Sequence, residues 1–173
     1  MVDRISRLVR DVPDFPTAGV TFRDITPLLG DAEALADMVT GVAAPWIGAG
    51  VTKVAGIEAR GFIVAAPVAL HLAAGFIPLR KPGKLPWRVE REAYELEYGS
   101  DALELHVDAI LAGDRVLIVD DVLATGGTAV AAVRLVERLG ATVVGVGVIL
   151  ELATLAGRDR LQGRDVHALL TDG

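Results

Sequence analysis

The chain of 173 residues contains no cysteine, which excludes disulfides and thiolate-bound metals and is compatible with a reducing cytosol. Positive charge is scarcer than negative charge: 17 Lys and Arg stand against 23 Asp and Glu. The net charge is −6, so the surface as a whole does not suit nucleic acid. The stretch MVDRISRLVRDVPDF lacks the apolar core of a secretory signal. We therefore expect a cytoplasmic protein without a nucleic-acid partner.

Long hydrophobic runs are scarce as well. Only the run from Phe62 to Leu79, which carries no Asp, Glu, Lys or Arg, approaches the length of a membrane-spanning helix. Pro67, Gly75 and Pro78 interrupt it, so we interpret the run as a buried helix, a glycine turn and a short buried strand. We expect no membrane association. The chain length and its 52% hydrophobic content favour a single domain over residues 1–173.

Short apolar runs alternate with helical patterns along the chain. The runs rich in β-branched and aliphatic residues, typical of strands buried on both faces of a parallel sheet, are Lys53–Ile57, Phe76–Leu79, Arg115–Val119 and Thr142–Leu150. Helices are expected at Ala32–Trp46 behind the N-cap Asp31, at Phe62–Ala74, and at Thr128–Leu139 before Gly140. This alternation predicts an α/β fold with a mainly parallel sheet flanked by helices.

One segment interrupts the alternation. Lys81–Gly99 is polar and charged and contains Pro82, Gly83 and Pro86. It is too long for a plain connection between two elements, so we interpret it as a functional loop that is partly a β-ribbon.

The stretch VLIVDDVLATGGT, residues 116–128, has the composition of an anion site. In open α/β sheets, ligands bind at the carboxyl ends of the strands, beside the following helices. Gly126 and Gly127 can adopt positive φ, and the N–H groups from Thr125 to Thr128 can point into one concavity at a helix N-terminus. The stretch matches neither a Walker loop nor a dinucleotide fingerprint. It predicts a phosphate-binding loop.

Two carboxylates, Asp120 and Asp121, stand beside this loop and would repel a bare phosphate. They fit a ligand that carries hydroxyl groups close to its phosphate, such as a ribose 5-phosphate. The two carboxylates would accept hydrogen bonds from its 2′- and 3′-hydroxyls. The alternative is that both aspartates only end a strand and solvate a turn.

VLIVDDVLATGGT resembles the phosphoribosyl pyrophosphate signature of type I phosphoribosyltransferases. Four further stretches resemble the adenine phosphoribosyltransferase family, in order and spacing, over nearly the whole chain: GVTFRDITPLL, GIEARGF, RKPGKLP and YELEYGSDALELHVDAI. The resemblance implies the type I fold, with a flexible β-ribbon lid loop at 80–99. It also implies a small hood (a subdomain over the base) that includes an adenine-binding segment at 1–30.

The implied reaction, a step of purine salvage, transfers the 5-phosphoribosyl group from phosphoribosyl pyrophosphate to N9 of adenine, giving AMP and diphosphate. By the same resemblance the protein is a homodimer and uses Mg²⁺. No protein-only metal site is expected, because the three histidines match no metal-binding spacing. Mg²⁺ would arrive on oxygens of the substrate.

The ends of the substrate have separate candidate residues. The ribose would bind Asp120 and Asp121, and the 5-phosphate would bind Ala124, Thr125, Gly126, Gly127 and Thr128. Cations after two of the expected strands suit the pyrophosphate: Arg60, Arg80, Lys81 and Lys84. Taken alone, the last three would also fit a solvated basic turn. The resemblance makes residues 58–61 the pyrophosphate loop, in which the family often has a non-proline cis peptide.

The base would bind Thr21, Phe22 and Arg23, with Phe22 stacking and the main chain of its two neighbours reading the edge of adenine. The alternative is a core Phe22 beside a surface pair of Arg23 and Asp24. The resemblance makes Glu97 the proton-transfer residue, with Glu95 in reserve, and gives Tyr98 a place on the loop.

Two other functions remain open at this stage. The sugar-phosphate signature is shared by phosphoribosyltransferases for xanthine, guanine or orotate. A sensor that binds phosphoribosyl pyrophosphate without turnover would also need it. Only the segments VTFRD and LEYG favour adenine, and the acidic chain shows no added DNA-binding region.

Overall fold

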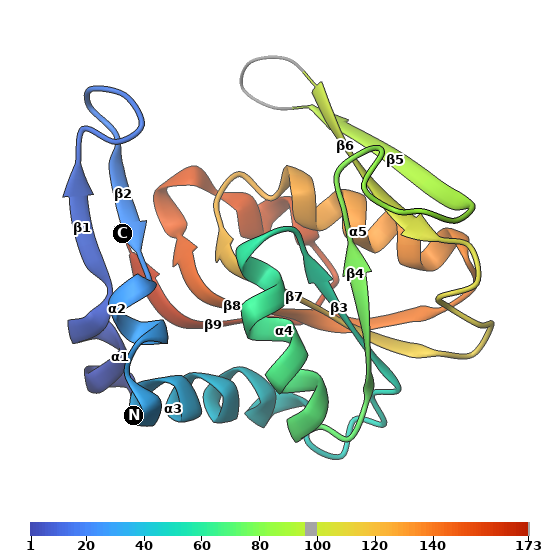
Figure 1. The fold of residues 1–173 in the computed structure, drawn as a ribbon, viewed down its shortest axis with the longest axis horizontal. Helices are drawn as coiled ribbons and strands as arrows, with labels where there is room; N and C mark the ends of the chain where they lie inside the picture. Colours follow the sequence, from blue (N-terminus) through green and yellow to red (C-terminus); the bar gives the residue numbers. More distant parts are fainter. Residues whose placement is uncertain (96–99, 173) are drawn as a thin grey trace.

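The computed structural model describes residues 1–95 and 100–172, and its core is a five-stranded parallel sheet (Figure 1). The strand order is β4-β3-β7-β8-β9. The strands are β3 (Lys53–Ile57), β4 (Gly75–Leu79), β7 (Arg115–Leu123), β8 (Thr142–Leu152) and β9 (Val166–Asp172). The predicted α/β fold with a mainly parallel sheet is confirmed.

Three helices flank the sheet, and each lies close to the place that the sequence predicts. They are α3 (Ala32–Ala43), continued by a 3-10 turn over Ala44–Trp46, α4 (Arg60–His71) and α5 (Gly127–Arg138). Asp31 caps α3, because its Oδ1 accepts the Ala34 N–H at 2.8 Å. Gly140, with φ of +86°, follows the end of α5.

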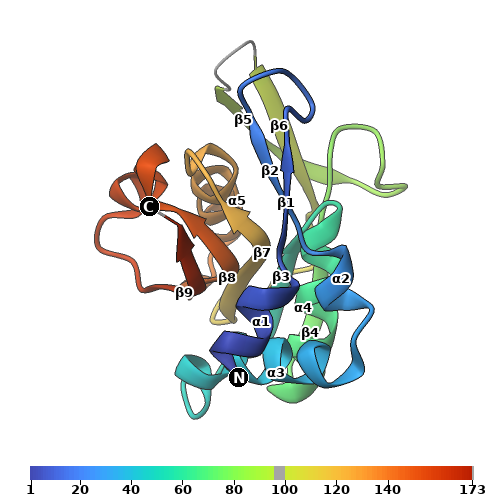
Figure 2. The same cartoon turned by 90° about the vertical axis from the view of Figure 1, so that its left-hand side faces the viewer.

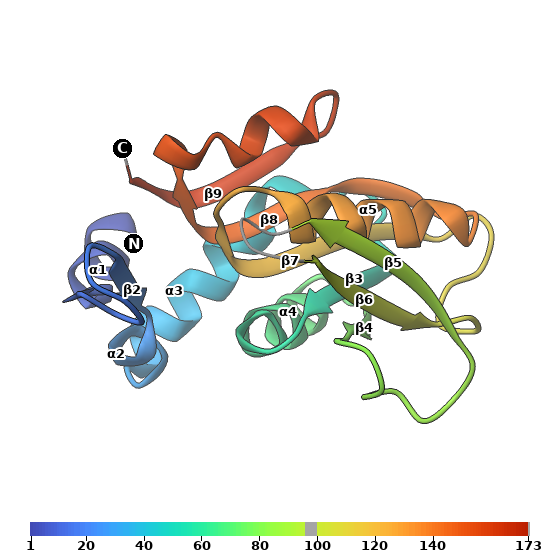
Figure 3. The same ribbon diagram turned by 90° about the horizontal axis from the view of Figure 1, so that it is seen from above.

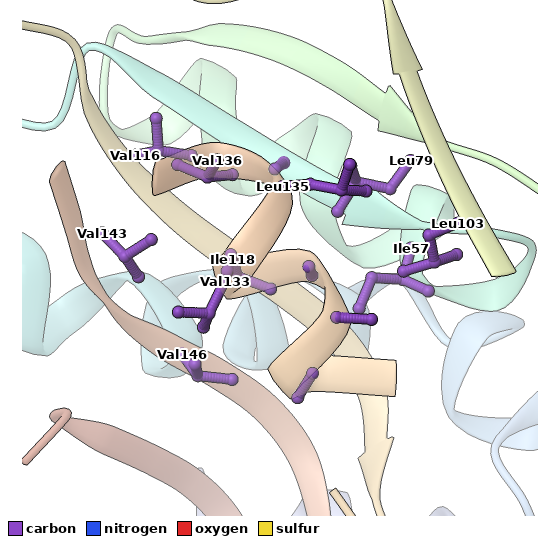
Figure 4. Packing of buried hydrophobic residues seen from close by; sticks show 14 of the residues in the cluster. Ile57, Leu79, Leu103, Val116, Ile118, Val133, Leu135, Val136, Val143 and Val146 are labelled. Carbon is purple, nitrogen blue, oxygen red and sulfur yellow. The ribbon is translucent and has the colours of Figure 1, made fainter. Parts of the chain in front are cut away.

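Strand β7 separates two hydrophobic clusters, since successive side chains of a strand point to opposite faces of a sheet. Val116 and Ile118 pack with α5 in one cluster (Figure 4). Leu117 and Val119 pack with α3 and α4 in the other cluster. All four side chains are fully buried, so β7 contributes to the hydrophobic core on both faces of the sheet.

The N-terminal segment forms a separate small unit. Helix α1 (Val2–Leu8) leads into an antiparallel hairpin of β1 (Arg10–Pro13) and β2 (Thr21–Asp24), followed by the short α2 (Thr26–Leu29). This hairpin extends beyond the sheet on the side where the C-terminal end of β4 lies (Figures 1 and 2). An ion pair between Arg23 and Asp172 joins it to β9.

The expected ribbon is present, but its second strand lies outside the predicted segment. Strand β5 (Val89–Glu95) pairs antiparallel with β6 (Ser100–His106), and both lie over α5 (Figure 3). Two helix arginines contribute to this contact: Arg134 pairs with Glu92 at 3.2 Å, and Arg138 pairs with Glu90 at 3.4 Å.

Several element boundaries differ from the sequence prediction by one to four residues, and two of these differences bear on the site. Helix α4 begins at Arg60 rather than Phe62. Strand β7 continues past Val119 to Leu123, because it keeps its parallel pairing with β8 through Leu123↔Glu151. Among the residues that the structure describes, no helix is long and apolar enough to cross a membrane, and the uncharged run at 62–79 belongs to α4 and β4.

Candidate active site

The predicted phosphate loop, residues 124–128, runs from the end of β7 into the first turn of α5. Gly126 has φ of +80°, and a Cβ there would lie 2.5 Å from the carbonyl oxygen of Gly157. Both the backbone conformation and the lack of space therefore require glycine at this position. Gly127 begins α5, which places the loop at the N-terminus of a twelve-residue helix. A cavity of about 80 Å³ is lined by the loop together with Ile57 and Asp120.

A second, larger cavity of about 390 Å³ shares Asp120, Ala124 and Thr128 with the first. Its wall brings together residues from five separate stretches of the chain: Ile57, Glu58, Ala59, Arg60, Lys81, Tyr94, Asp101, Leu103, Asp120, Asp121, Val122, Ala124 and Thr128. The structure therefore gathers the predicted phosphate loop, both ribose aspartates and two of the four predicted cations around one space.

Asp120 and Asp121 lie within β7, not after its end as the sequence suggested. Oδ1 of Asp120 accepts the Asp121 N–H at 2.9 Å. The carboxyl of Asp120 is deep enough that burial, followed by the neighbouring charge of Asp121, raises its pKa well above the usual range. A Cβ at Gly61 would lie 2.7 Å from Asp120 Oδ1, so glycine there lets α4 approach β7 closely.

Arg60, on the first turn of α4, connects the aspartates to the N-terminal hairpin. Its Nε lies 2.9 Å from Asp121 Oδ2, and its guanidinium carbon lies 4.9 Å from the centre of the Phe22 ring. Phe22 also packs edge-on against Phe15, with ring centres 5.2 Å apart. The predicted base-binding ring and the predicted ribose carboxylates are therefore bridged by one side chain.

The rest of the predicted adenine segment lies in β2 beside Phe22. The guanidinium of Arg23 binds Asp11 and Asp172, whereas Asp24 pairs with Arg10 at 2.5 Å. The alternative of a surface pair between Arg23 and Asp24 is therefore wrong. Since the side chain of Arg23 is occupied in this way, its main chain remains the part that suits recognition of a base.

Glu58 organises the predicted cation cluster. Its Oε2 accepts hydrogen bonds from Arg80 Nε at 3.1 Å and from the Lys81 N–H at 3.0 Å. Burial alone would raise the pKa of Glu58, but these hydrogen bonds outweigh it and lower the pKa. The Glu58–Ala59 peptide is cis, as the family resemblance suggested.

Of the three cations near residue 80, only Lys81 lines the larger cavity. Its Nζ lies 2.5 Å from Asp101 Oδ2, and this ammonium lowers the pKa of Asp101. Arg80 instead donates from Nη1 to the carbonyl of the exposed Lys84 at 3.3 Å. Arg80 and Lys84 therefore stand beside the cavity, outside its wall.

Two polar residues of the wall were missed from the sequence. Tyr94 and Asp101 face each other across the ribbon, with the Tyr94 hydroxyl 3.4 Å from Asp101 Oδ2. A single carboxylate in a polar segment gives no signal by itself, and only the β5–β6 register brings it beside Tyr94. Glu97 and Tyr98 lie outside the described residues, as does the side chain of Glu95.

The fold and the cavity walls define a phosphoribosyltransferase. In agreement with this class, the model of the phosphoribosyl transferase domain family matches residues 28–167, which is most of the chain.

The particular family follows from individual relatives. The chain is 56% identical over 171 residues to the adenine phosphoribosyltransferase of Anaeromyxobacter dehalogenans strain 2CP-C, covering 99% of each chain. The crystal structure of adenine phosphoribosyltransferase from Rhodothermus marinus has a TM-score of 0.95 at 50% identity, with 99% and 98% of the two chains covered. The enzyme from Saccharomyces cerevisiae, complexed with adenine and an imino-altritol bisphosphate, has a TM-score of 0.93 at 36% identity, with 98% of each chain covered. The chain belongs to the adenine phosphoribosyltransferase family.

Proposed function

We propose that the chain transfers the 5-phosphoribosyl group from phosphoribosyl pyrophosphate to N9 of adenine in purine salvage, giving AMP and diphosphate. One observation carries this proposal. A single cavity of about 390 Å³ is lined by part of a phosphate loop, by the adjacent carboxylates of β7 and by the cations Arg60 and Lys81, a set that matches a sugar bearing phosphate groups at two positions. Relatives that share more than half of their residues with this chain are named for this activity.

The sugar end of the substrate would bind at the carboxyl end of β7. N–H groups and threonine hydroxyls of residues 125–128 would hold the 5-phosphate at the start of α5. Asp120 and Asp121 would accept the ribose hydroxyls, which explains why carboxylates stand beside a site for an anion. As the pyrophosphate leaves ahead of bond formation, positive charge builds on the sugar, and the same carboxylates stabilise it.

The pyrophosphate end would bind Arg60 and Lys81, whose opposite charge matches the leaving group. In the described conformation both cations are paired, Arg60 with Asp121 and Lys81 with Asp101. An incoming pyrophosphate would therefore share or compete for these cations with the two protein carboxylates. We propose that Arg80 and Lys84 act beside this site, Arg80 by a hydrogen bond to Glu58, whose carboxylate also accepts the Lys81 N–H.

Mg²⁺ fits these residues as a partner of the substrate. Among residues 1–95 and 100–172, no group of three or more potential ligand side chains is present that would hold a metal, while Asp120 and Asp121 supply hard oxygen donors next to the cavity. When bound to the substrate, Mg²⁺ would neutralise charge on the pyrophosphate.

Adenine would stack on Phe22, and the main chain of Thr21 and Arg23 would pair with its 6-amino group and N1. Hypoxanthine would leave these polar groups mismatched once the base covers them, which is the basis of strong discrimination. We propose Glu97 as the residue that takes the N9 proton, with Glu95 in reserve and Tyr98 on the same loop.

An assay of nucleotide formation tests the proposal. The protein would be mixed with phosphoribosyl pyrophosphate, Mg²⁺ and adenine, hypoxanthine, guanine, xanthine or orotate, with the Glu97→Gln and Glu95→Gln variants in parallel. AMP formed from adenine alone, and slowed in the Glu97 variant but not in the Glu95 variant, is the expected result. Turnover of another base would overturn the adenine assignment. Binding of phosphoribosyl pyrophosphate without any product would favour a sensor.

We also propose a homodimer in the cytoplasm. Helix α4 exposes Ile63 and Leu70, seven residues apart on one face, with 48% and 83% of these residues accessible. The family resemblance implies a second copy as partner, and we propose that this exposed apolar face of α4 contacts it. Sedimentation of the protein, alone and with Leu70→Glu, would show a dimer that weakens in the variant.

A further inference from the structure

The segment from Ala153 to Leu161, between β8 and β9, lies against the back of the phosphate loop. A Cβ at Gly157 would lie 2.0 Å from the Ala124 carbonyl oxygen and 2.9 Å from the Gly126 nitrogen. Reciprocally, a Cβ at Gly126 would lie 2.5 Å from the Gly157 carbonyl oxygen. Two backbones therefore touch without any side chain between them, and the position of Gly157 limits the position of the loop.

An ion pair fastens this segment to the sheet. Arg158, next to Gly157, binds Glu151 in a two-pronged contact, with Nε to Oε1 at 2.8 Å and Nη2 to Oε2 at 2.5 Å. Glu151 is only 6% exposed and lies near the end of β8. Nη1 of Arg158 also donates to the Val166 carbonyl at 2.8 Å, so one guanidinium joins the segment to both β8 and β9.

The same short turn has further contacts on either side of Arg158. Arg160 Nη1 lies 3.5 Å from the carbonyl oxygen of Thr125, in the phosphate loop. Leu161 is buried in the cluster that also contains Val146 and Val148 of β8. No residue from 153 to 161 lines either cavity of the site, so the segment supports the loop from outside.

We propose that Glu151 and Arg158 are positioning residues for the 5-phosphate: their ion pair holds Gly157 against the phosphate loop and thereby sets the directions of the loop N–H groups. This inference rests on the proposed function, since it assigns a role within the same site. Neither residue touches the substrate. The pair acts by fixing a backbone whose N–H groups must converge on one phosphate, a geometry that tolerates little displacement.

The test compares Arg158→Ala, Arg158→Lys and Glu151→Gln with the wild-type enzyme. We expect Arg158→Ala and Glu151→Gln to raise the KM for phosphoribosyl pyrophosphate and the Kd for ribose 5-phosphate by about tenfold, the weakening expected when the displaced loop loses one charge-assisted hydrogen bond to the phosphate. The KM for adenine at saturating phosphoribosyl pyrophosphate should stay within about twofold. Lysine keeps the charge but not the two-pronged contact, so Arg158→Lys should recover part of the affinity.

Met38→Ala is the matched control for a loss of stability. Met38 is fully buried in α3, in the cluster that does not contain α5, and truncation there lowers the melting temperature without touching the phosphate loop. At equal loss of melting temperature, only the Glu151 and Arg158 variants should show the selective rise in KM. The inference would be overturned if the Glu151 and Arg158 variants bound ribose 5-phosphate as tightly as wild type. It would also be overturned if their KM for adenine rose as much as their KM for phosphoribosyl pyrophosphate. Failure of the proposed function can be told apart from failure of this inference, because wild-type protein would then form no AMP.

Discussion

Arg60 Nε lies 2.9 Å from Oδ2 of Asp121, an oxygen that is buried and accepts no well-aligned hydrogen bond from the described residues. The guanidinium is thus the ionic partner of a buried carboxylate at the same time as it lies over the Phe22 ring. A buried charge without its partner destabilises the folded protein. Arg60 is therefore needed both to bind substrate and to keep Asp121 stable in its place.

Replacing Arg60 should therefore affect both activity and stability. We expect Arg60→Ala to lower kcat/KM by about 100-fold, close to 3 kcal/mol, because it removes a pyrophosphate ligand and leaves Asp121 unpaired. Arg60→Lys should recover only part of this, since an ammonium lacks the planar group that lies over Phe22. Steady-state kinetics measures the activity of both variants, and thermal melting measures their stability. Arg4→Ala, which breaks an exposed pair with Glu33 far from the site, should leave kcat/KM unchanged.

Asp120 should oppose folding at neutral pH. Its pKa is raised in the folded protein above the ordinary value of 3.8, so the folded state holds the proton more tightly than the unfolded state. The associated stability is fully present below that value and is lost as the pH rises through the folded pKa. Asp120→Asn should accordingly melt at a higher temperature than wild type at pH 7, and the difference should shrink toward pH 4.

The same Asp120 variant should lose activity, because an amide is a weaker acceptor for a ribose hydroxyl than a carboxylate. A fall in kcat/KM of about tenfold or more corresponds to one charge-assisted hydrogen bond of about 1.5–3 kcal/mol. Asp108→Asn, at an exposed carboxylate, is the control for both measurements. A lower melting temperature for Asp120→Asn at pH 7 would contradict the linkage argument.

Gly126 and Gly163 provide a matched comparison of the phosphate loop with an ordinary turn. Both have nearly the same positive φ, +80° and +77°, but a Cβ at Gly163 would meet nothing within 4 Å. Alanine at either position should cost about 1–2 kcal/mol for its left-handed backbone. Only Gly126→Ala should also weaken ribose 5-phosphate binding, as measured by calorimetry. Equal affinities in the two variants would show that the loop tolerates the displacement.

Mg²⁺ should bind together with the substrate. In titration calorimetry, Mg²⁺ added to the protein alone should give little heat, and Mg²⁺ added with phosphoribosyl pyrophosphate should give a clear binding curve. Removing Mg²⁺ with EDTA should then lower turnover, and excess Mg²⁺ should restore it. Tight stoichiometric binding of Mg²⁺ to the free protein would point to a site made by the chain itself.

Local patterns were sufficient to predict that the elements carrying the site exist, but not all of their bounds. The run Lys53–Ile57 is strand β3 with the same bounds, and Asp31 caps α3 as its position predicts. The end of β7 was misplaced because two aspartates interrupt its apolar run, while its pairing with β8, which no local pattern encodes, continues to Leu123. The roles of Asp101 and Gly157 depend on strand register and on contacts between distant segments, so composition gave no sign of them.

Helix α5 begins at the phosphate loop, and its later turns bind β5 through Arg134 and Arg138. Strand β5 leads directly into residues 96–99, where Glu97 stands. One helix therefore contacts both the phosphate loop and the strand that precedes Glu97. Coupling free energies are reciprocal, so if phosphate binding shifts the ribbon by some factor, the same shift of the ribbon alters phosphate affinity by that factor.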